Sequence, residues 1–532
     1  MRIFVCHASE DKAAVAALCG MLTAEGIECW FDVESLNPGD EWEMQIRKAI
    51  RRSQAVLVCL SARAIAKKTF LKREIDLILA AAESQARPSN FVFPVLLERC
   101  AIPRRLSRWQ AVDISHSDAP GALLRSLREM ASTVPGIRVP GDHATEAEWR
   151  EPLIREQLPE IVDSTRSYER WLKSLTPLIA KNRSIKHDRM SLSPFTFFRG
   201  TFYRWAEAWP VECPDLARAP MVVSAGDVSI SSFGTWLDSA GRLGWGLTTM
   251  DEAYPLPYTN DLIRLTTSVA VAAATVQTKL AGGLKRMCET VLSAYRKTLQ
   301  RGGAPIVLGA KYSWLYELTF ERRMKPPRYW ERFGLKSRYH RLRAVPVEVH
   351  EALERVLPID ATFSVLAHSA GVGNVDRPRF LAVAQWQGGP VGAVASYIPP
   401  PAAAWAAGVT QDVPNFHNRI LATARRTPNL RSGVWKGVFV RQIGPEIGGG
   451  LDVTRVMKKK IFRKLIRACA TEVANVHAGT PGGQARVLQH LDTLPPDWLQ
   501  RASEIMMSRN EADFLKWRSS FMAKKSQKAK QR

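Results

Sequence analysis

The sequence has few cysteines and lacks the short ligand motifs of several protein classes. Only eight of the 532 residues are cysteine, and no two stand closer than ten positions apart. This spacing excludes Cys-x₂-Cys zinc and redox motifs, and it is typical of reduced thiols in a cytoplasm. The ten histidines form no His-x₃-His pair. We therefore expect no metal site.

Long apolar runs are also absent. The densest, Ala55–Leu60 and Val269–Ala274, end after six residues, whereas a membrane-spanning helix needs about 20. The chain begins MRIFVCHASEDK, with an acidic pair where a secretory signal has its apolar core. We expect a cytoplasmic protein that has no membrane partner and is not exported.

Three motifs of nucleotide and hydrolase sites are missing as well. The sequence contains no GxGxxG, no GxxxxGK[ST] and no GxSxG. A Rossmann dinucleotide fingerprint, a phosphate-binding P-loop and a serine nucleophile elbow are therefore not predicted.

Positive charge is abundant and unevenly distributed. The formal net charge is +24, but residues 1–134 hold 18 Lys and Arg against 16 Asp and Glu, so the excess lies in the remainder. We infer two modules with different partners. The basic module has a surface for nucleic acid, an acidic protein, anionic lipid or phosphorylated ligands, or a merely solvated one. No zinc finger, RNP motif or basic-region heptad accompanies the charge.

The first module alternates short apolar runs with amphipathic stretches. Runs of five or six residues predict buried parallel strands at Arg2–Cys6, Ile27–Phe31, Ala55–Leu60 and Phe91–Leu96. Helical stripes are predicted at Val15, Leu18, Cys19 and Leu22, and at Leu71, Ile75, Ile78 and Ala82. This order predicts an α/β fold with a doubly wound parallel sheet, whose ligands bind beyond the carboxyl ends of the strands.

Five segments of this module resemble a known family. They read, in order, IFVCHASEDK, CWFDVESLNPGDEW, VLVCLSARAI, FLKREIDLIL and VFPVLLERCAIP. Together they resemble a bacterial Toll/interleukin-1 receptor (TIR) domain over residues 1–133. The resemblance implies a flavodoxin-like sheet, self-association through TIR domains, and cleavage of NAD⁺ between nicotinamide and ribose. NAD⁺ would be the substrate, with no separate cofactor.

The resemblance makes Glu74 the catalytic residue. Family enzymes carry a glutamate on the helix after the third strand, in a Trp-Val-x-x-Glu segment that reads Phe70 to Glu74 here. Glycosidic cleavage passes through an oxocarbenium-like state, which one carboxylate can stabilise. Nicotinamide already leaves from a cation, so no general acid is needed. The alternative is a surface glutamate paired with Lys67 or Lys72.

Four further residues are candidates for contacting NAD⁺. Phe70 takes the place of the family's tryptophan and keeps its apolar role. Glu34 matches a glutamate that contacts NAD in some family members, or it is a solvated loop acid. His7 and Ala8 fall where the family lays the nucleotide, or they simply end a strand.

The segment after the second predicted strand carries a loop and one more acid. Leu36–Trp42 matches the loop that gates the family's pocket and joins neighbouring subunits, and it holds a Pro-Gly turn signal. Asp32 is interpreted as structural rather than catalytic.

Composition places the domain boundaries. Two Pro-Gly turns in nine residues, 134–142, open a linker that we extend over residues 134–159. The basic domain is predicted at 160–522. The last residues, 523–532, read AKKSQKAKQR and are predicted to be a disordered basic tail.

Four stretches of the basic domain resemble a second family. They are RMSLSPFTFFRG (189–200), SAGDVSISSFG (224–234), MDEAYPLPYTNDLIRLTTS (250–268) and SAGVGNVDRPRF (369–380), with weaker echoes in VFVRQIGP (438–445) and ANVHA (474–478). Together they resemble the bacterial domain-of-unknown-function family 2252, whose pattern is similar to that of aminoglycoside phosphotransferases and kinases. The resemblance implies an α+β kinase-like domain.

The chain departs from that family's pattern where phosphoryl transfer needs it. Ser229 and Ser232 replace a histidine and an asparagine, Thr249 replaces an aspartate, and Asp376 replaces a glycine of the glycine loop. No lysine occurs between Lys336 and Lys436. Phosphoryl transfer depends on metal ligands and positive clamps around the phosphates.

We therefore expect a non-catalytic domain in which a few motif residues remain. Asp227, Asp251 and the Gly371 loop are interpreted as structural remnants. Arg199 either binds an anion or pairs with Asp227, and the sequence does not separate these alternatives.

Three functional hypotheses follow from the two resemblances. The favoured one is an NAD⁺ hydrolase that acts as a bacterial antiviral effector, switched on by assembly, with the basic domain sensing a trigger such as nucleic acid or an acidic protein. The alternative is a TIR adaptor without turnover. A phosphotransferase with an appended TIR domain is disfavoured because the phosphate-pairing lysine is missing.

Overall fold

The computed structural model of the chain describes most of the second module and the central sheet of the first. The longer described ranges are residues 2–24, 27–30, 55–66, 92–98, 100–107, 109–114, 151–238, 240–320, 326–331, 344–358, 361–368, 376–409, 415–448 and 459–530. Single positions or pairs are described at 50, 53, 75, 78–79, 123, 127, 149, 342, 413 and 457.

The chain divides into two compact units. Unit 1 comprises Met1–Arg138 with Leu357–Ala361, and unit 2 comprises Val139–Val356 with Thr362–Arg532. The main division, between Arg138 and Val139, falls inside the predicted linker, residues 134–159. Each unit is described by itself below.

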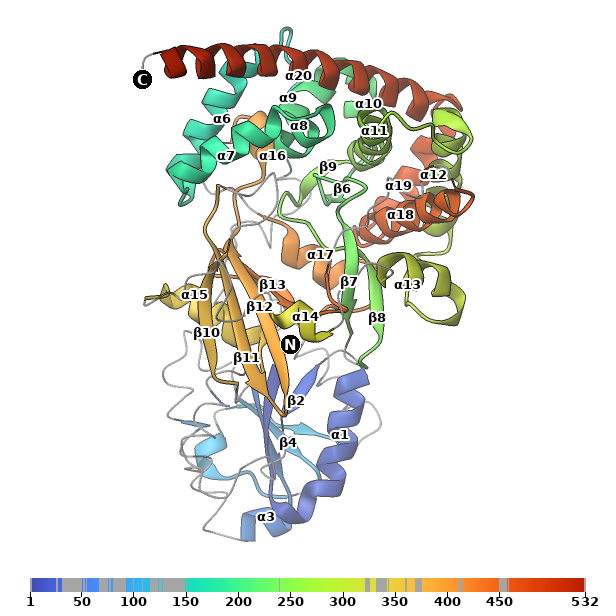
Figure 1. The fold of residues 1–532 in the computed structure, drawn as a ribbon. Helices are drawn as coiled ribbons and strands as arrows, with labels where there is room; N and C mark the ends of the chain where they lie inside the picture. Colours follow the sequence, from blue (N-terminus) through green and yellow to red (C-terminus); the bar gives the residue numbers. More distant parts are fainter. Residues whose placement is uncertain are drawn as a thin grey trace. The chain divides into compact units, whose positions relative to one another are not determined.

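Unit 1 is built on a five-stranded parallel sheet (Figure 1). Its strands are β1 (Arg2–Cys6), β2 (Glu28–Trp30), β3 (Ala55–Leu60), β4 (Val92–Leu96) and β5 (Val112–Asp113). Their order is β2-β1-β3-β4-β5. This is the order of a flavodoxin-like doubly wound sheet, so the predicted fold class of this unit is confirmed.

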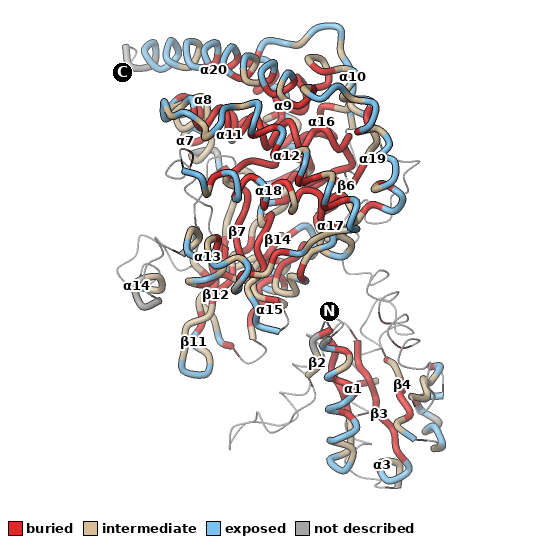
Figure 2. The backbone as a smooth tube through the Cα atoms, turned by 90° about the vertical axis from the view of Figure 1, so that its right-hand side faces the viewer, coloured by how far each residue is buried: buried red, intermediate tan, exposed pale blue. Residues whose placement is uncertain are grey.

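Both faces of the sheet carry apolar side chains, and each face is covered by other apolar residues. On one face Phe4, Val56 and Val58 join a cluster with Ile75 and Ile78. On the other, Ile3, Val5 and Leu57 join the stripe of helix α1 (Lys12–Ala24), which consists of Val15, Leu18, Cys19 and Leu22. All six residues of β3 are buried (Figure 2). Helices on both faces leave the carboxyl edge of the strands as the place for a site.

The four predicted strands are present with bounds shifted by at most one residue where they are described. Strands β1 and β3 begin and end where predicted, and β2 and β4 each start one residue later. The two-residue strand β5 was not predicted, because Val112–Asp113 is too short to give a run. Two short helices, α3 (Ala62–Ala66) and the 3₁₀ turn η1 (Ser9–Asp11), follow strands at the carboxyl edge.

Unit 2 begins with a helical group and two antiparallel two-stranded sheets. Its first elements are α6 (Ile161–Leu175), α7 (Ala180–Met190), α8 (Pro194–Gly200), α9 (Phe202–Glu212), α10 (Pro214–Ala217), β6 (Met221–Ser224), β7 (Phe233–Leu237), β8 (Leu243–Leu247) and β9 (Tyr254–Pro257). Strand β6 pairs with β9, and β7 pairs with β8.

Helices and a second sheet complete unit 2. The helices are α11 (Thr259–Thr275), α12 (Gly283–Gln300), α13 (Ser313–Phe320), α14 (Pro326–Glu331), α15 (Val347–Val356), α16 (Ala402–Ala406), α17 (His417–Thr423), α18 (Ile461–His477), α19 (Gly483–Thr493) and α20 (Trp498–Lys530). The strands β10 (Phe363–His368), β11 (Arg379–Trp386), β12 (Gly389–Tyr397), β13 (Ser432–Trp435) and β14 (Val438–Ile443) form an antiparallel sheet in the order β10-β11-β12-β14-β13.

Helix α11 lies at the centre of this unit. Every residue from Thr259 to Ala273 is buried, and the helix packs against α8, α12 and α20. The long helix α20 runs along one side of the unit (Figure 1). Segregated helices and an antiparallel sheet make this an α+β unit. A kinase-like relationship stays a prediction.

The carboxyl end of the chain differs from its prediction. Helix α20 continues to Lys530 and so includes most of the segment 523–532, which was predicted to be disordered. The last turns with described side chains are exposed (Figure 2). Alanine, lysine and glutamine are good helix formers, so a solvated basic segment can extend a helix that packing has already nucleated.

Candidate functional site

The carboxyl edge of the unit 1 sheet gathers polar side chains from three strand ends. The Ser61 hydroxyl, directly after β3, donates a 2.8 Å hydrogen bond to Asp11 Oδ2 in the turn after β1. Ser61 Oγ also accepts from the Ala64 backbone N–H at 3.0 Å and so caps α3. The Ala62 N–H donates to Glu98 Oε1, after β4, at 2.8 Å. One strand end is thus tied to its two neighbours.

Two predicted NAD⁺-contacting residues lie at this edge. His7 and Ala8 directly follow β1 and are half-buried. The carbonyl oxygen of Ala8 accepts a 2.9 Å hydrogen bond from the Asp11 N–H, which fixes the turn. The loop on which His7 stands is therefore held by the same polar network as Ser61.

The other predicted site residues fall outside the described part of the chain. These are Glu74, Phe70, Glu34, Asp32 and the Leu36–Trp42 loop. Their roles stay predictions. The residue after Glu74 is described, however: Ile75 is buried in one cluster with Cys6 and Leu60, the last residues of β1 and β3.

Three polar residues at this edge were missed by the sequence analysis. Asp11, Ser61 and Glu98 each stand within a quoted segment of the TIR resemblance or next to one, which was the available signal. Burial raises the pKa of the Cys59 thiol in the adjoining strand, and the Asp11 carboxylate raises it further. Cys59 is therefore a packing residue rather than a nucleophile.

Unit 2 contains a polar cavity of about 190 Å³ where several family-like segments meet. Five cationic side chains and three carboxylates line it, together with serines, a threonine and aromatic residues. The charged lining residues are Lys186, Arg199, Arg377, Arg379, Arg441, Asp227, Asp251 and Glu252. They come from α7, α8, β11, β14 and three loops that are far apart in the sequence.

The Asp227 loop is fastened to the central helix. Asp261, fully buried near the start of α11, accepts hydrogen bonds from the backbone N–H groups of Ala225 at 3.0 Å and Gly226 at 3.2 Å. His477 Nε2 lies 3.1 Å from Asp261 Oδ2, the oxygen that also accepts from the Ala225 N–H. The segments 224–234, 250–268 and 474–478 of the second resemblance are thus bonded together.

Arg264 is the ion-pair partner of Asp227. Its Nε donates a 2.7 Å hydrogen bond to Asp227 Oδ1, and its guanidinium lies 4.1 Å from the ring centroid of Phe198. Arg264 is fully buried. In the described part of unit 2, Arg199 lies near Asp227 without an ion pair, so the pairing alternative for Arg199 is wrong.

The remaining carboxylates of the cavity also have partners. Asp251 pairs with Arg377 at 3.3 Å, and Asp376 pairs with Lys186 at 3.2 Å. Glu252 accepts a 2.6 Å hydrogen bond from the Ala402 backbone N–H. Burial raises the pKa of Glu252 to about 8, and the neighbouring Asp251 charge adds to the effect.

The arrangement supplies cations that the linear pattern lacks. No lysine stands between Lys336 and Lys436, but Lys186 and Arg441 reach the cavity from outside that interval. Arg264, Arg377, Arg379 and Arg441 were not predicted as site residues, although each lies within a segment quoted for the second resemblance. The arginines within those segments were the available signal.

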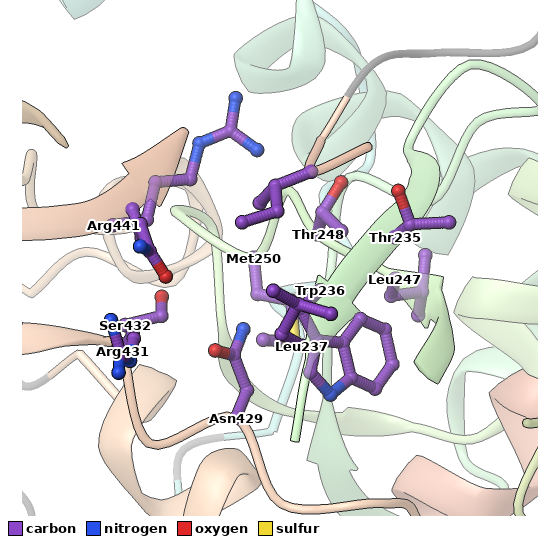
Figure 3. A pocket seen from close by; sticks show the side chains of 12 residues that line it. Thr235, Trp236, Leu237, Leu247, Thr248, Met250, Asn429, Arg431, Ser432 and Arg441 are labelled. Atoms are coloured by element: carbon purple, nitrogen blue, oxygen red, sulfur yellow. The ribbon is translucent and has the colours of Figure 1, made fainter. Parts of the chain in front are cut away.

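A smaller cavity adjoins the charged one. Its volume is about 10 Å³, too little for more than one water molecule. Figure 3 shows its lining, with the Trp236 ring beside Leu237 and the guanidinium of Arg441 extending away from that ring. Arg441 therefore borders this space without filling it.

The described residues include neither a group of metal ligands nor a membrane-spanning helix. No three His, Cys, Asp or Glu side chains among them are grouped as a metal site. None of the described helices combines the length and apolarity needed to cross a membrane. Gly371 lies outside the described residues, so its loop stays a prediction.

Two family models match the chain. Residues 3–127 match the TIR domain model, and residues 178–325 match the model described as "Uncharacterized protein conserved in bacteria (DUF2252)". Both resemblances are confirmed. The second match includes the first three quoted segments, whereas SAGVGNVDRPRF (369–380) lies beyond it.

Curated relatives and a solved structure also resemble unit 1. The chain is 43% identical over 75 residues to the NAD(+) hydrolase PdTIR of Paracoccus denitrificans, and 33% identical over 79 residues to the NAD(+) hydrolase TcpA of a Theionarchaea archaeon. These alignments cover 14% and 15% of this chain. The chain spans about a quarter of the length of either relative, 25% and 24%. The crystal structure of the TIR domain of the Toll-related receptor TRR-2 from Hydra magnipapillata matches at 21% identity with a TM-score of 0.21, covering 24% of this chain and 97% of that one.

Proposed function

Because residues 3–127 form a TIR domain, we propose that this region hydrolyses NAD⁺. The bond cleaved is the one between nicotinamide and ribose, and the products are nicotinamide and ADP-ribose or a cyclic form of it. The observation that carries the proposal is the similarity to two relatives named NAD(+) hydrolases. The polar edge of a flavodoxin-like sheet is also where such folds bind nucleotides.

Glu74 is the proposed catalytic residue. Departure of neutral nicotinamide leaves positive charge on the ribose ring, and a carboxylate beside that ring lowers the energy of this state. The buried position of Ile75, in one cluster with Cys6 and Leu60, supports a location of Glu74 near the carboxyl edge. His7, Ala8, Glu34 and Phe70 are proposed to hold the nucleotide.

Assembly is proposed to switch the enzyme on. A site at the open edge of a sheet is poorly closed, and the Leu36–Trp42 loop of a neighbouring copy would complete it. The basic unit 2 would gather copies by binding a trigger such as nucleic acid or an acidic protein, through contacts that weaken as salt rises. In a bacterial cell such a protein would act in antiviral defence by depleting NAD⁺.

The test of the catalytic proposal compares full-length protein with two variants at high protein concentration. Glu74→Gln keeps the size of the side chain and removes its charge, so NAD⁺ consumption should fall at least about a hundredfold while the melting temperature stays unchanged. Glu317→Gln, on an exposed face of unit 2, is the charge-matched control and should retain the rate. Undiminished turnover by a folded Glu74→Gln protein would overturn the role of Glu74, and a wild-type protein that consumes no NAD⁺ would favour the adaptor without turnover.

Assembly is tested separately from chemistry. The rate per molecule should climb with protein concentration, and Pro38→Ala should blunt the climb. A rate strictly proportional to enzyme over a roughly hundredfold range, from a species that light scattering shows to be monomeric, would overturn activation by assembly and leave the role of Glu74 in place.

A further inference from the structure

Three arginines of the unit 2 cavity have no acidic partner. Among the described residues, ion pairs within the cavity join Lys186, Arg264 and Arg377 to carboxylates. Arg199, Arg379 and Arg441 line the same cavity and form no ion pair with a described carboxylate, although the charges of Asp227 and Asp251 act on Arg199 and Arg379. The three guanidinium groups come from α8, β11 and β14. They therefore converge on the cavity only in the folded unit.

Burying these charges without a partner costs free energy. Burial lowers the pKa of Arg379 to about 10, and it lowers the pKa of Arg199 and Arg441 as well. A guanidinium resists deprotonation strongly, so these shifts mark poorly compensated charge. The buried Nε atoms of Arg377 and Arg379 also have no hydrogen-bond partner in the described structure. An anion bound in this cavity would compensate these charges and supply the missing hydrogen-bond acceptors.

We propose that this cavity of unit 2 binds a small phosphorylated anion, with Arg199, Arg379 and Arg441 neutralising its charge. A phosphate group offers several acceptor oxygens to the planar fork of each arginine. The volume of about 190 Å³ equals the space of about six water molecules, which suits a phosphate chain and excludes a polymer. The site is independent of NAD⁺ hydrolysis by unit 1.

A second cavity, of about 70 Å³, shares Arg377, Arg379 and Arg441 with the first. Its other lining residues include Val394, Ile398, Pro399 and Phe439. The shared arginines border both the charged chamber and this partly apolar slot, which Thr248, Ser396 and His417 also line. A phosphorylated compound with an apolar or aromatic part would fill both.

His417 gives the apolar slot a polar feature of its own. The side chain is 1% exposed, and its Nδ1 lies 3.2 Å from the Met250 carbonyl oxygen, so the proton of the neutral ring is on Nδ1. Nε2 is then an acceptor, and it has no hydrogen-bond partner among the described residues. An N–H or O–H group on the ligand would pair with it. A nucleotide and a free polyphosphate are thus the two sources to distinguish.

The test measures binding to the full chain by titration calorimetry, in EDTA and at moderate ionic strength. The probes are inorganic triphosphate, ATP and adenosine. Both phosphate compounds should bind, and adenosine should not. Arg379→Gln and Arg441→Gln should each weaken triphosphate binding about tenfold or more. Arg286→Gln removes an exposed arginine of α12 and should leave the affinity unchanged.

Melting temperatures separate a binding role from a structural one. Arg379→Gln and Arg441→Gln remove uncompensated charge, so the melting temperature without ligand should stay level or rise while the triphosphate-induced increase is lost. Arg199→Gln, at a half-buried position, repeats the test with less disturbance of the core. A lower melting temperature with unchanged affinity would overturn the proposal.

Two further outcomes decide the matter. No binding of either phosphate compound at millimolar concentration, or equal weakening by Arg286→Gln, would overturn the site. Equal affinities for ATP and triphosphate would support recognition of the phosphate chain alone. Tighter binding of ATP that is lost in His417→Phe would support the same site with a nucleotide as its occupant.

Discussion

The two units place their polar groups in opposite ways. In unit 1 the buried strand residues are apolar, and the polar residues Asp11, Ser61 and Glu98 lie beyond the carboxyl ends of the strands, at the edge of the sheet. In unit 2 charged residues enter the interior, as Asp261 and Arg264 do in α11. Unit 1 therefore has an apolar core with polar residues at the edge of its sheet, whereas unit 2 has charged residues within its core.

This difference determines how far each site can be predicted from the sequence. The unit 1 site depends on short segments that directly follow strands, so a linear motif predicts it. The unit 2 cavity depends on pairs between distant segments, such as Lys186 with Asp376 and Asp251 with Arg377. Such pairs are visible only in three dimensions.

Asp261→Ala should have the largest effect. The carboxylate accepts hydrogen bonds from two backbone N–H groups and lies 3.1 Å from His477 Nε2, so its loss leaves buried groups unsatisfied. We expect about 3–5 kcal/mol of destabilisation of unit 2. Hydrogen exchange should accelerate in peptides covering α11 and leave those of α1 unchanged.

The control for this prediction is Asp215→Ala. Asp215 is 96% exposed and faces Arg218 at 3.8 Å, so its removal should cost less than about 0.5 kcal/mol. Equal exchange rates in the two variants would show that the buried carboxylate is not what fastens the Asp227 loop.

Gly226→Ala should follow in size. Gly226 has a φ of +76°, and a Cβ there would meet the Glu252 carbonyl oxygen at 2.3 Å. The left-handed backbone and the clash together should cost about 3 kcal/mol and displace Asp227. Gly241 has a φ of +72° with nothing within 4 Å of a Cβ, so Gly241→Ala reports the backbone cost alone, about 1 kcal/mol. Chemical denaturation that ranks the two variants equally would contradict the clash.

Much of unit 1 could be predicted because its information is local. Runs of β-branched residues gave the strands, and the helical stripe of Val15, Leu18, Cys19 and Leu22 is buried as expected. The hydrogen-bonded edge was missed, because nothing in the spacing of Asp11 and Ser61 shows that a hydroxyl of one reaches the carboxylate of the other.

Less of unit 2 could be predicted because its contacts are long-range. The segments were identified by resemblance, but the ion-pair partner of Asp227 is Arg264, from the middle of α11, and not Arg199. The sequence has no lysine between Lys336 and Lys436, but it does not follow that the cavity lacks cations. Cations from α7 and β14 reach the cavity by folding. Linear spacing does not report which side chains share a cavity.

A moderate effect is expected at the edge of unit 1. Ser61→Ala removes the 2.8 Å hydrogen bond to Asp11 and the cap on the Ala64 N–H. Ser61 is buried, so we expect a loss of about 1–2 kcal/mol, seen as faster exchange at the start of α3. Ser9→Ala is the control, because the exposed Ser9 hydroxyl donates only to adjacent Glu10 at 3.2 Å. Equal exchange in both variants would mean that the edge network does not order α3.

The smallest effect concerns pH and tests the proposed anion site. Burial and the nearby Asp251 charge raise the pKa of Glu252 to about 8, and the Asp227 charge also raises it. Arg377 and the hydrogen bond from the Ala402 N–H act in the opposite direction and lower it. Tyr168 also faces it, with a pKa held well above its ordinary value by burial. As pH rises from 7 to 9, Glu252 loses its proton, and the new negative charge repels a bound phosphate. The probe for this test is phenyl phosphate, a monoester whose second pKa lies near 6, so that it is mostly doubly ionised at pH 7 and its charge changes little in this window.

The affinity for phenyl phosphate should therefore fall about fivefold between pH 7 and pH 9. In Glu252→Gln the profile should be nearly flat, because the amide oxygen can still accept from the Ala402 N–H while carrying no titrating charge. Calorimetry at several pH values checks both profiles, with Arg286→Gln as a variant that should retain the wild-type slope. The same slope in Glu252→Gln would assign the pH dependence to another group, and an affinity that rises with pH would contradict an anion in this cavity. Because the cavity combines a carboxyl that is largely protonated near neutrality with arginines that stay charged, its preference for anions should be strongest at and below pH 7.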